Sequence, residues 1–517
     1  NEAVTETYNS SDRTDTTRSI NARLGLDYQL NKSTVIGALL SGNERKYTQS
    51  ELKESATFKN QIRDTVTRFS NSESNRWKNY SINFNIQHRF KKNEELVLNF
   101  DYIHYSNDQP VNYFASYYDG SENFLYDEAT RSGKSTLFIF KVGALDYSAS
   151  ISNNVKMQTG IKETIGGFEN DISFEKYHQN NWAKEPNLSA DYTLNENYSA
   201  AYISFNVTVS KSTDAKLGAR YEYTNSNLGT ALVKNIVDRH YGNLFPTLFL
   251  SHLINENNKI SFSYSMRINR PKFTDLAPFT YFSDPKTVIT GNPELQPSIS
   301  NTVKGDYTFK KYLFSLSYSK EDDAITGFQP ETDSVTNKVV VTPKNLINKK
   351  TVFVSLSTPV TVNTWWSMQY NISGLWQQTN LFYKKERLQF SQINYRINAI
   401  ESFKLPKQWS AELSGFYQSP LLLGITTSRA LGSLDLGIKK KLNGNHGSFL
   451  ISANNILNTQ RRGFHVNLPA QNLVSDGNAR FIWPSYKLTY THNFGKEKLK
   501  VKRERVTGAE EEKGRVN

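Results

Sequence analysis

Short stretches in which apolar and polar residues alternate recur along this chain. In residues 260–268 every even position is apolar and every odd position is serine or arginine. Side chains in a β-strand point alternately to its two faces, so such a stretch forms a strand with one apolar and one polar face. Residues 20–30, 80–90 and 486–494 follow the same rule. The repeat predicts many two-faced strands.

The connections between these strands alternate strictly in length. Long connections are expected at residues 107–131, 167–196, 229–241, 271–295, 329–345 and 459–478. A soluble sandwich has no reason for such alternation, whereas a membrane barrel joins its strands by short periplasmic turns and longer external loops. We therefore predict an all-β, transmembrane antiparallel β-barrel. Its short connections are expected near Ser152, Ser212, Asn257, Lys310, Val362, Pro406 and Gly444.

Composition supports a barrel and excludes a membrane-spanning helix. Hydrophobic residues make up 37% of the 517 residues, aromatic residues 13%, and the mean hydropathy is -0.60. No run of about 18 apolar residues is present, as a spanning helix requires. A barrel needs apolar residues only at every second strand position and places aromatic residues at both interfaces. It therefore looks polar overall.

The net charge and the residue types limit which partners and metal sites the protein can have. The net charge is +13, but the basic residues are spread over strand faces and loops. We therefore expect the protein to contact outer-membrane lipids and not to bind nucleic acid. The absence of cysteine excludes thiolate metal sites and cysteine nucleophiles. The 8 histidines are scattered singly. We expect no metal and no cofactor.

No catalytic signature is present. The chain lacks the HExxH, G-x-S-x-G, P-loop and GxGxxG patterns. Its acidic pairs, among them Glu94-Glu95 and Asp322-Asp323, lie at turns and at the base of a loop, where solvated charge is the ordinary role. We predict that the protein is not an enzyme and name no catalytic residue.

One long segment carries a family resemblance. Residues 264–301, YSMRINRPKFTDLAPFTYFSDPKTVITGNPELQPSISN, resemble a signature segment of TonB-dependent outer-membrane receptors, especially the barrel portion found in Bacteroidota. In that family an arginine-rich strand end runs into an L-x-P-F/Y loop and then G-N-P-x-L-x-P. The matching positions here are Arg267, Arg270, Pro271, Leu276, Pro278, Phe279, Gly291, Asn292, Pro293, Leu295 and Pro297.

The C-terminal end extends the resemblance. Residues 449–464 resemble the family's penultimate hairpin, and residues 485–495 resemble its closing strand. The basic ending from Lys496 to Asn517 also has counterparts in Bacteroidota-type members. We expect residues 1–494 to form the barrel and residues 495–517 to form a disordered, basic periplasmic tail.

The resemblance implies a larger architecture than the strands counted here. We count about 19 strands, whereas bacterial single-chain barrels have an even number. The family implies 22 strands preceded by an N-terminal plug domain. We therefore interpret the chain as a barrel fragment that begins near the fourth strand, without the plug and the first strands.

The implied function is import. The family captures a ligand at its extracellular loops and draws it into the periplasm, powered by an energy-transducing TonB-type complex that acts through the plug. Ligand classes in the family include ferric chelates, cobalamin, glycans and peptides, and a surface lipoprotein is a further partner. The alternative is an unplugged structural or adhesion barrel that binds partner proteins. A plug of roughly 100–150 residues upstream would exclude that alternative.

Aromatic residues crowd two of the expected external loops and are the candidate ligand-binding residues. Exposed rings beside polar groups suit a flat or ring-shaped ligand. The alternative is that the rings form the outer aromatic girdle or pack loop on loop. Similarly, Arg23, Arg89, Arg220 and Arg267 would contact a plug or an anionic ligand, or simply balance charge in the lumen. The aromatic candidates are Tyr113, Phe114, Tyr117, Tyr118, Phe279, Tyr281 and Phe282.

Overall fold

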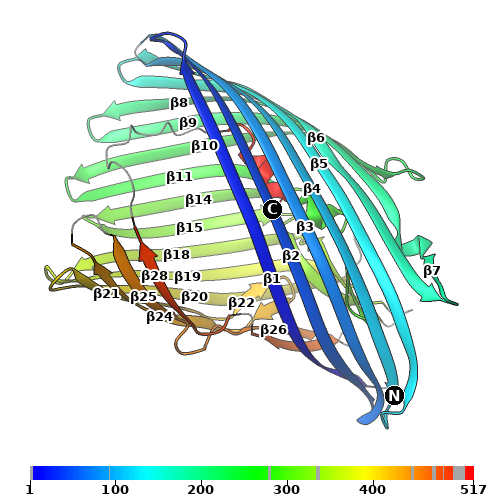
Figure 1. Ribbon diagram of the computed structural model, residues 1–517. Coiled ribbons are helices and arrows are strands. Elements are labelled where there is room, and N and C mark those ends of the chain that lie inside the picture. The colour runs from blue at the N-terminus through cyan, green and yellow to red at the C-terminus, as the bar shows by residue number, and fades with distance from the viewer. Residues whose placement is uncertain are drawn as a thin grey trace.

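The chain folds into one large antiparallel sheet that curves around an interior (Figure 1). A computed structural model describes residues 4–91, 93–277, 281–333, 338–443, 447–468, 473–480, 482–492 and 507–516. Over these ranges the main sheet has 20 strands. They are β1 (Thr5–Gln29), β2 (Thr34–Lys59), β3 (Ile62–Lys91), β4 (Glu94–Asp119), β5 (Phe124–Ser152), β6 (Val155–His178), β7 (Asn181–Lys184), β8 (Ala190–Ser210), β9 (Thr213–Thr230), β10 (Val237–Asn255), β11 (Asn258–Asn269), β14 (Ser298–Phe309), β15 (Tyr312–Asp322), β18 (Asn348–Thr361), β19 (Trp366–Tyr383), β20 (Glu386–Leu405), β21 (Trp409–Gln418), β24 (Leu431–Lys441), β25 (Ser448–Asn454) and β28 (Ser485–Thr491).

The main sheet is a meander in which each strand pairs with the next one along the chain. The four-residue β7 pairs only with β6, and β8 takes its place as the next full strand. Within the described ranges β1 pairs with β2 alone and β28 with β25 alone. A closed wall of 22 strands therefore remains a prediction.

The long connections in the second half of the chain build two small sheets and the short helix α1. Residues 270–297 contain α1 (Phe273–Leu276), β12 (Tyr281–Asp284) and β13 (Thr287–Ile289). The first small sheet joins β12 and β13 to β16 (Ile325–Thr332) and β17 (Val339–Asn345). The remaining elements are η1 (Pro186–Leu188), β22 (Leu421–Leu423), β23 (Thr426–Ser428), β26 (Arg462–Leu468), β27 (Leu473–Ala479) and α2 (Glu510–Val516). None of the helices in the described residues has the length and apolar character to cross a membrane.

The two faces of the wall are opposite in character, as the sequence predicts. Leu24 and Leu26 on β1 are 71% and 70% exposed, and Ile82 and Tyr102 lie opposite each other on the same outer face. The residues next to these on the two strands, Asn83 and Asp101, point inward and are buried. The Asn83 amide donates to Asp101 at 2.9 Å. An apolar outer face around a polar interior is the arrangement that a lipid bilayer requires.

Three of the expected long connections are shorter than predicted because the strands continue. The segment expected as a loop at residues 107–131 is mostly strand, since β4 runs to Asp119 and β5 starts at Phe124. The strands on either side of the expected loops at residues 167–196 and 229–241 likewise run into those segments. The sequence loses its alternation here because a strand outside the membrane needs no apolar face, while its ladder of backbone hydrogen bonds still forms.

Two regions of the wall differ in height as a result. The tall wall consists of β1–β6, whose strands have 24 to 30 residues. In the low wall, β11, β14 and β15 have only 12, 12 and 11 residues. A membrane-crossing strand needs about 9–11 residues. The low wall is therefore just long enough to cross, and the tall wall continues well beyond.

The lumen contains an apolar core as well as polar side chains. Inward-facing Phe138 and Phe140 of β5 and Phe168 of β6 are at most 2% exposed. Phe273 of α1 stacks on Phe140 with ring centroids 5.3 Å apart. Since an exposed apolar patch in water is unfavourable, the loop between β11 and β14 folds inward to cover it. The segment that carries the family resemblance thus lies inside the wall.

Candidate functional site

The inward loop, residues 270–297, is held by the residues of the family motif. Phe273 and Leu295 are fully buried and Leu276 is 6% exposed, all three in the lumenal apolar core. At Gly291 a Cβ atom would lie 2.0 Å from the carbonyl oxygen of Ala277, so only glycine allows the two chain segments to approach this closely.

Further motif residues tie the loop together. The Asn292 backbone N–H donates to the Asp275 carbonyl at 2.6 Å, and its side-chain amide donates to the Pro343 carbonyl at 3.1 Å. Burial raises the pKa of Asp275, with Lys272 opposing it. The motif therefore encodes the shape of an internal loop. Pro278 and Phe279, which the motif also includes, lie outside the described residues.

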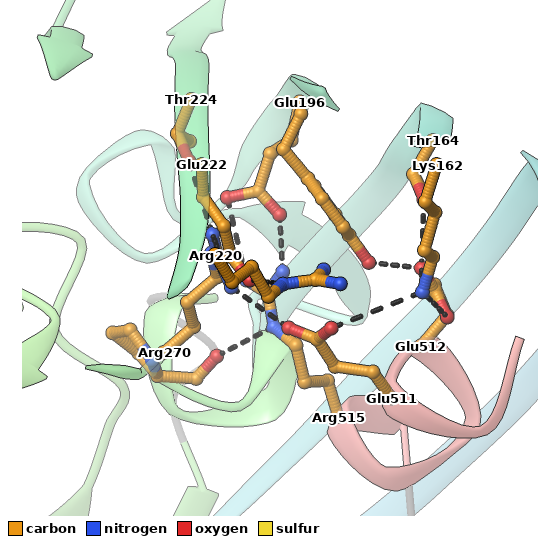
Figure 2. A network of polar contacts seen from close by, with 12 residues as sticks. Lys162, Thr164, Glu196, Arg220, Glu222, Thr224, Arg270, Glu511, Glu512 and Arg515 are labelled. Atoms are coloured by element: carbon orange, nitrogen blue, oxygen red, sulfur yellow. Dashed lines mark hydrogen bonds and ion pairs between the residues drawn. The ribbon is translucent and has the colours of Figure 1, made fainter. Parts of the chain in front are cut away.

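Arg270 is the polar centre of the lumen (Figure 2). Its side chain is 2% exposed, and Nη2 donates to Glu222 at 2.7 Å and to the Thr224 hydroxyl at 3.1 Å. Nη1 donates to Glu511 at 2.7 Å, and the guanidinium lies 4.7 Å from the centre of the Tyr198 ring. Burial alone would lower the pKa of Arg270, but the two carboxylates outweigh it and raise that pKa. The guanidinium therefore stays charged and is held by Glu222, Thr224 and Glu511.

The C-terminal helix α2 joins the same network. Glu512 forms an ion pair with Lys162 on β6 at 2.9 Å and accepts hydrogen bonds from Thr164 at 2.8 Å and from the Tyr198 hydroxyl on β8. Burial opposes ionisation of Glu512, but Lys162 and Tyr198 outweigh it and hold its pKa below the ordinary value. Figure 2 shows Glu511 and Glu512 pointing from α2 toward these wall residues.

The expected disorder of the tail is wrong for residues 507–516. Arg515 pairs with Glu196 of β8, and its Nε donates to the Pro271 carbonyl at 3.1 Å. Ala509, Glu512 and Val516 are at most 2% exposed. Sequence reasoning missed this docking because the partners lie far away in the chain, for example 350 residues between Lys162 and Glu512. Residues 495–506 of the tail lie outside the described part, so their periplasmic placement remains a prediction.

The predicted aromatic residues from the two loops meet, but several of them bury one another. Tyr113 is 4% exposed, Phe282 is 9% exposed, and their ring centroids lie 6.0 Å apart. The Tyr281 hydroxyl accepts from Asn71 at 3.3 Å, and burial raises its pKa. Tyr113 and Tyr117 lie on strand β4 rather than in a loop. These rings hold the inward loop against the tall wall.

The other predicted rings face a different surface. Phe114 and Tyr118 alternate with Tyr113 and Tyr117 along β4, so they point to the opposite face, where Phe114 is 46% exposed. A shallow hollow of about 360 Å³ lies here. Sequence reasoning missed Trp182, whose ring stands 4.4 Å from the Arg131 guanidinium. The hollow is lined by Ser50, Ser70, Asn71, Ser72, Asn112, Tyr113, Phe114, Ala129, Thr130 and Trp182.

The four predicted lumenal arginines do not form one site. Arg220 pairs with Glu222, the carboxylate that also binds Arg270. Arg89 pairs with Glu95 at 3.0 Å, near a short turn. Arg23 and Arg267 are exposed to the lumen. Over the described residues, no group of three or more histidine, cysteine, aspartate or glutamate side chains is arranged to hold a metal ion.

Comparisons with known proteins agree with this architecture. A sequence model of the outer membrane protein beta-barrel family matches residues 88–492. No curated protein sequence matches the chain.

Solved structures show the same fold at low sequence identity. The ferric-catecholate import receptor Fiu from E. coli K12 has a TM-score of 0.54 at 9% identity, covering 92% of this chain and 80% of Fiu. The copper transporter OprC has a TM-score of 0.55 at 10% identity, covering 95% and 80%. BauA, the ferric preacinetobactin receptor from Acinetobacter baumannii, has a TM-score of 0.52 at 11% identity, covering 94% and 79%.

Proposed function

The chain belongs to the outer membrane protein beta-barrel family, and from that premise we propose that it is a TonB-dependent outer-membrane receptor. It captures a ligand at its extracellular surface and imports it into the periplasm. The similar folds of a ferric-catecholate import receptor and a copper transporter support this assignment.

The observation that carries the proposal is the inverted wall. Leucine and isoleucine side chains on the outer face stay exposed while amides and carboxylates line the interior. Such a wall is stable only where lipid covers the outer face. With the short turns on the periplasmic side, the tall wall projects outward from the cell.

The tall wall is then the surface that a ligand meets first. The hollow beside Phe114 and Trp182 has the volume of a small-molecule site, about 300–1,000 Å³. Its lining combines aromatic rings with serine and asparagine side chains, which suits a flat or ring-shaped ligand such as a chelate, a vitamin or a sugar. We assign ligand capture to this hollow.

Import requires a path through the lumen, which the inward loop and α2 narrow. In this proposal a TonB-type complex supplies the force that opens the path. A surface lipoprotein that covers the hairpin tips is a further partner.

The test is energised uptake in the bacterium that encodes the chain. A deletion strain and its complemented parent are supplied with labelled ferric chelates, cobalamin, glycans and peptides. We expect deletion to abolish uptake of one class, and a protonophore to stop uptake while surface binding persists. Unchanged uptake of every class, or uptake that a protonophore leaves intact, would contradict import.

Binding at the hollow is tested separately. Substitution of Phe114→Ala together with Trp182→Ala should lower affinity for the imported ligand at least tenfold. Phe124→Ala is the matched control, because Phe124 is 58% exposed on a hairpin tip and does not line the hollow. Equal affinities of the two variants would move the capture site elsewhere.

A further inference from the structure

Helix α2 contacts both the wall and the inward loop, in addition to the direct contacts between those two parts. Its contacts with the wall run from Glu512 to Lys162 and Thr164, both on β6, and from Arg515 to Glu196 on β8. From the inward loop, Arg270 donates to Glu511 of the helix. Arg515 of the helix donates to the Pro271 carbonyl and lies over the Phe273 ring. The helix therefore lies between wall and loop and binds both (Figure 2).

The contacts are specific in charge. Glu512 is 1% exposed and Arg515 is 7% exposed, so each lies where water does not reach. A buried charge is tolerated only beside an opposite charge and hydrogen-bond partners. Glu512 meets the cation of Lys162, and Arg515 meets the anion of Glu196 together with the Pro271 carbonyl. A segment with other residues at these two positions would not fit.

The helix depends on the lumen for its own folding. It has only seven residues, and isolated helices shorter than about 12–15 residues are marginal in water. Before its first turn, the Gly508 N–H donates to Asp101 at 2.9 Å, and the Thr507 hydroxyl donates to Glu510 at 2.6 Å. The segment therefore becomes ordered as it docks, in the manner of a bound peptide.

We propose that the lumen bounded by β6, β8, β9 and the inward loop is a peptide-binding site for the chain's own residues 507–516, and that this segment is a releasable latch joining the loop to the wall. This inference goes beyond ligand import, since it requires only that the tail and the loop share the lumen. Release of the latch removes the tail's share of the contacts on the loop and leaves the loop held by Arg270 on Glu222 and by Phe273 on Phe140.

Disulfide trapping tests the docked position. The chain has no native cysteine, so engineered pairs are unambiguous. A Cβ at Gly508 lies 3.4 Å from the Ala144 Cβ, close to the separation in a disulfide, about 3.5–4.5 Å. The pair Ala144→Cys with Gly508→Cys should cross-link in outer membranes. Ala144→Cys with Gly514→Cys is the control, because a Cβ at Gly514 meets nothing within 4 Å. Cross-linking of both pairs alike, or of neither, would overturn the docked position.

Peptide binding tests specificity. A labelled peptide of residues 505–517 is added to the full chain carrying Glu512→Gln and Arg515→Gln, whose own tail is weakened. We expect it to bind at least tenfold more tightly than a control peptide that carries the same two substitutions. It should also bind at least tenfold more weakly to the unsubstituted chain, whose tail occupies the site. Equal binding of the two peptides would overturn the proposed recognition.

The latch is tested by proteolysis of the loop. In the Glu512→Gln, Arg515→Gln variant, trypsin cleavage after Lys272 and Lys286 should accelerate at least tenfold, while cleavage after Lys32, at a short turn, stays constant. Cleavage of the loop at an unchanged rate would show that the tail does not hold the loop, and would contradict the latch.

Discussion

The tall wall and the inward loop of the low wall differ in where they place the residues beyond those needed to cross a membrane. Both regions contain strands long enough to cross a membrane, which takes about 9–11 residues. In the tall wall, β2 and β3 then continue as a ladder to a two-residue turn after Lys59. In the low wall, the chain leaves β11 after Asn269 and folds into the lumen. The difference lies in what the extra residues contain.

Residue type decides between the two outcomes. The extension of the tall wall carries serine, threonine and charged residues on both faces, with apolar residues such as Leu52 and Tyr113 interspersed, so its hydrogen-bond ladder can form in water. The inward loop carries Phe273, Leu276 and Leu295, which need burial, together with prolines that cannot extend a central ladder. The regions meet where Lys53 of β2 pairs with Asp284 of β12 at 2.7 Å. The loop is therefore braced against the tall wall.

The largest effect is expected from removing the centre of the inward loop. Arg270→Met leaves Glu222 paired only with the partly exposed Arg220, and breaking a buried pair costs up to about 3–5 kcal/mol. The control is Arg267→Met, since Arg267 is exposed. The stability of both variants is measured as the urea concentration at which the folded band disappears from an unboiled gel. Equal destabilisation would show that the loop is not anchored through Arg270.

A matched pair on one strand separates the membrane band from the tall extension. Leu40 and Leu52 lie on the same outer face of β2, at 47% and 66% exposure. Arginine on the lipid face near the midplane costs about 2–4 kcal/mol, and close to nothing outside the membrane. Leu40→Arg should therefore lower stability in bilayers and Leu52→Arg should not. If Leu52→Arg lowered stability and Leu40→Arg did not, the membrane would lie at the level of Leu52, which would contradict this account.

A smaller effect is expected from Gly291→Ala in the inward loop. The added methyl group meets the Ala277 carbonyl, and forced overpacking of this kind costs about 1–3 kcal/mol. Gly305→Ala on β14 is the control, because nothing lies within 4 Å of its Cβ. Limited proteolysis should cleave the Gly291→Ala loop sooner. Identical cleavage of the two variants would show that the loop tolerates the methyl group.

The smallest effect is expected from pH acting on the docked tail. The pKa of Glu512 is lower in the docked state than its ordinary value of 4.5, since the Lys162 and Tyr198 contacts outweigh burial. Glu512 therefore favours docking above pH 4.5, and this contribution is lost as the pH falls through the lowered pKa. Also facing the site are Thr164, Asp101 near the start of α2, and Arg270 beside Glu511.

The yield of the Ala144–Gly508 cross-link measured against pH should fall on the acid side. Glu512→Gln in the same background should flatten that fall, because glutamine does not titrate. A profile that Glu512→Gln leaves unchanged would assign the acid sensitivity to another group.

The two opposite faces of the wall could be predicted from the sequence, whereas the height of the tall wall and the contacts in the lumen could not. The outward leucines of β1 and the short connections near Ser152, Asn257 and Lys310 follow from alternation, which is local. The height of the tall wall was missed because polar and apolar residues are mixed on both faces of these strands, so the sequence shows no regular alternation there. The docking of α2 was missed because charge pairing across hundreds of residues leaves no local pattern.

The family motif shows both sides of this limit. Its residues were identified from the sequence, but their roles depend on partners elsewhere. Arg270 binds Glu222 and Glu511, and Asn292 binds the Pro343 carbonyl. The predicted ring cluster was found in the same way, yet Tyr113 and Phe282 pack on each other, and the hollow beside Phe114 depends on Trp182 from β7.

The most direct test of the inverted wall is the reactivity of single cysteines on β2 in intact cells. Leu40→Cys and Leu52→Cys are each exposed to a membrane-impermeant maleimide before and after the outer membrane is dissolved. We expect Leu52→Cys to react in intact cells, and Leu40→Cys to react only after lipid is removed and the protein is unfolded. Equal reactivity of both positions in intact cells would contradict a membrane-embedded wall with a tall external extension.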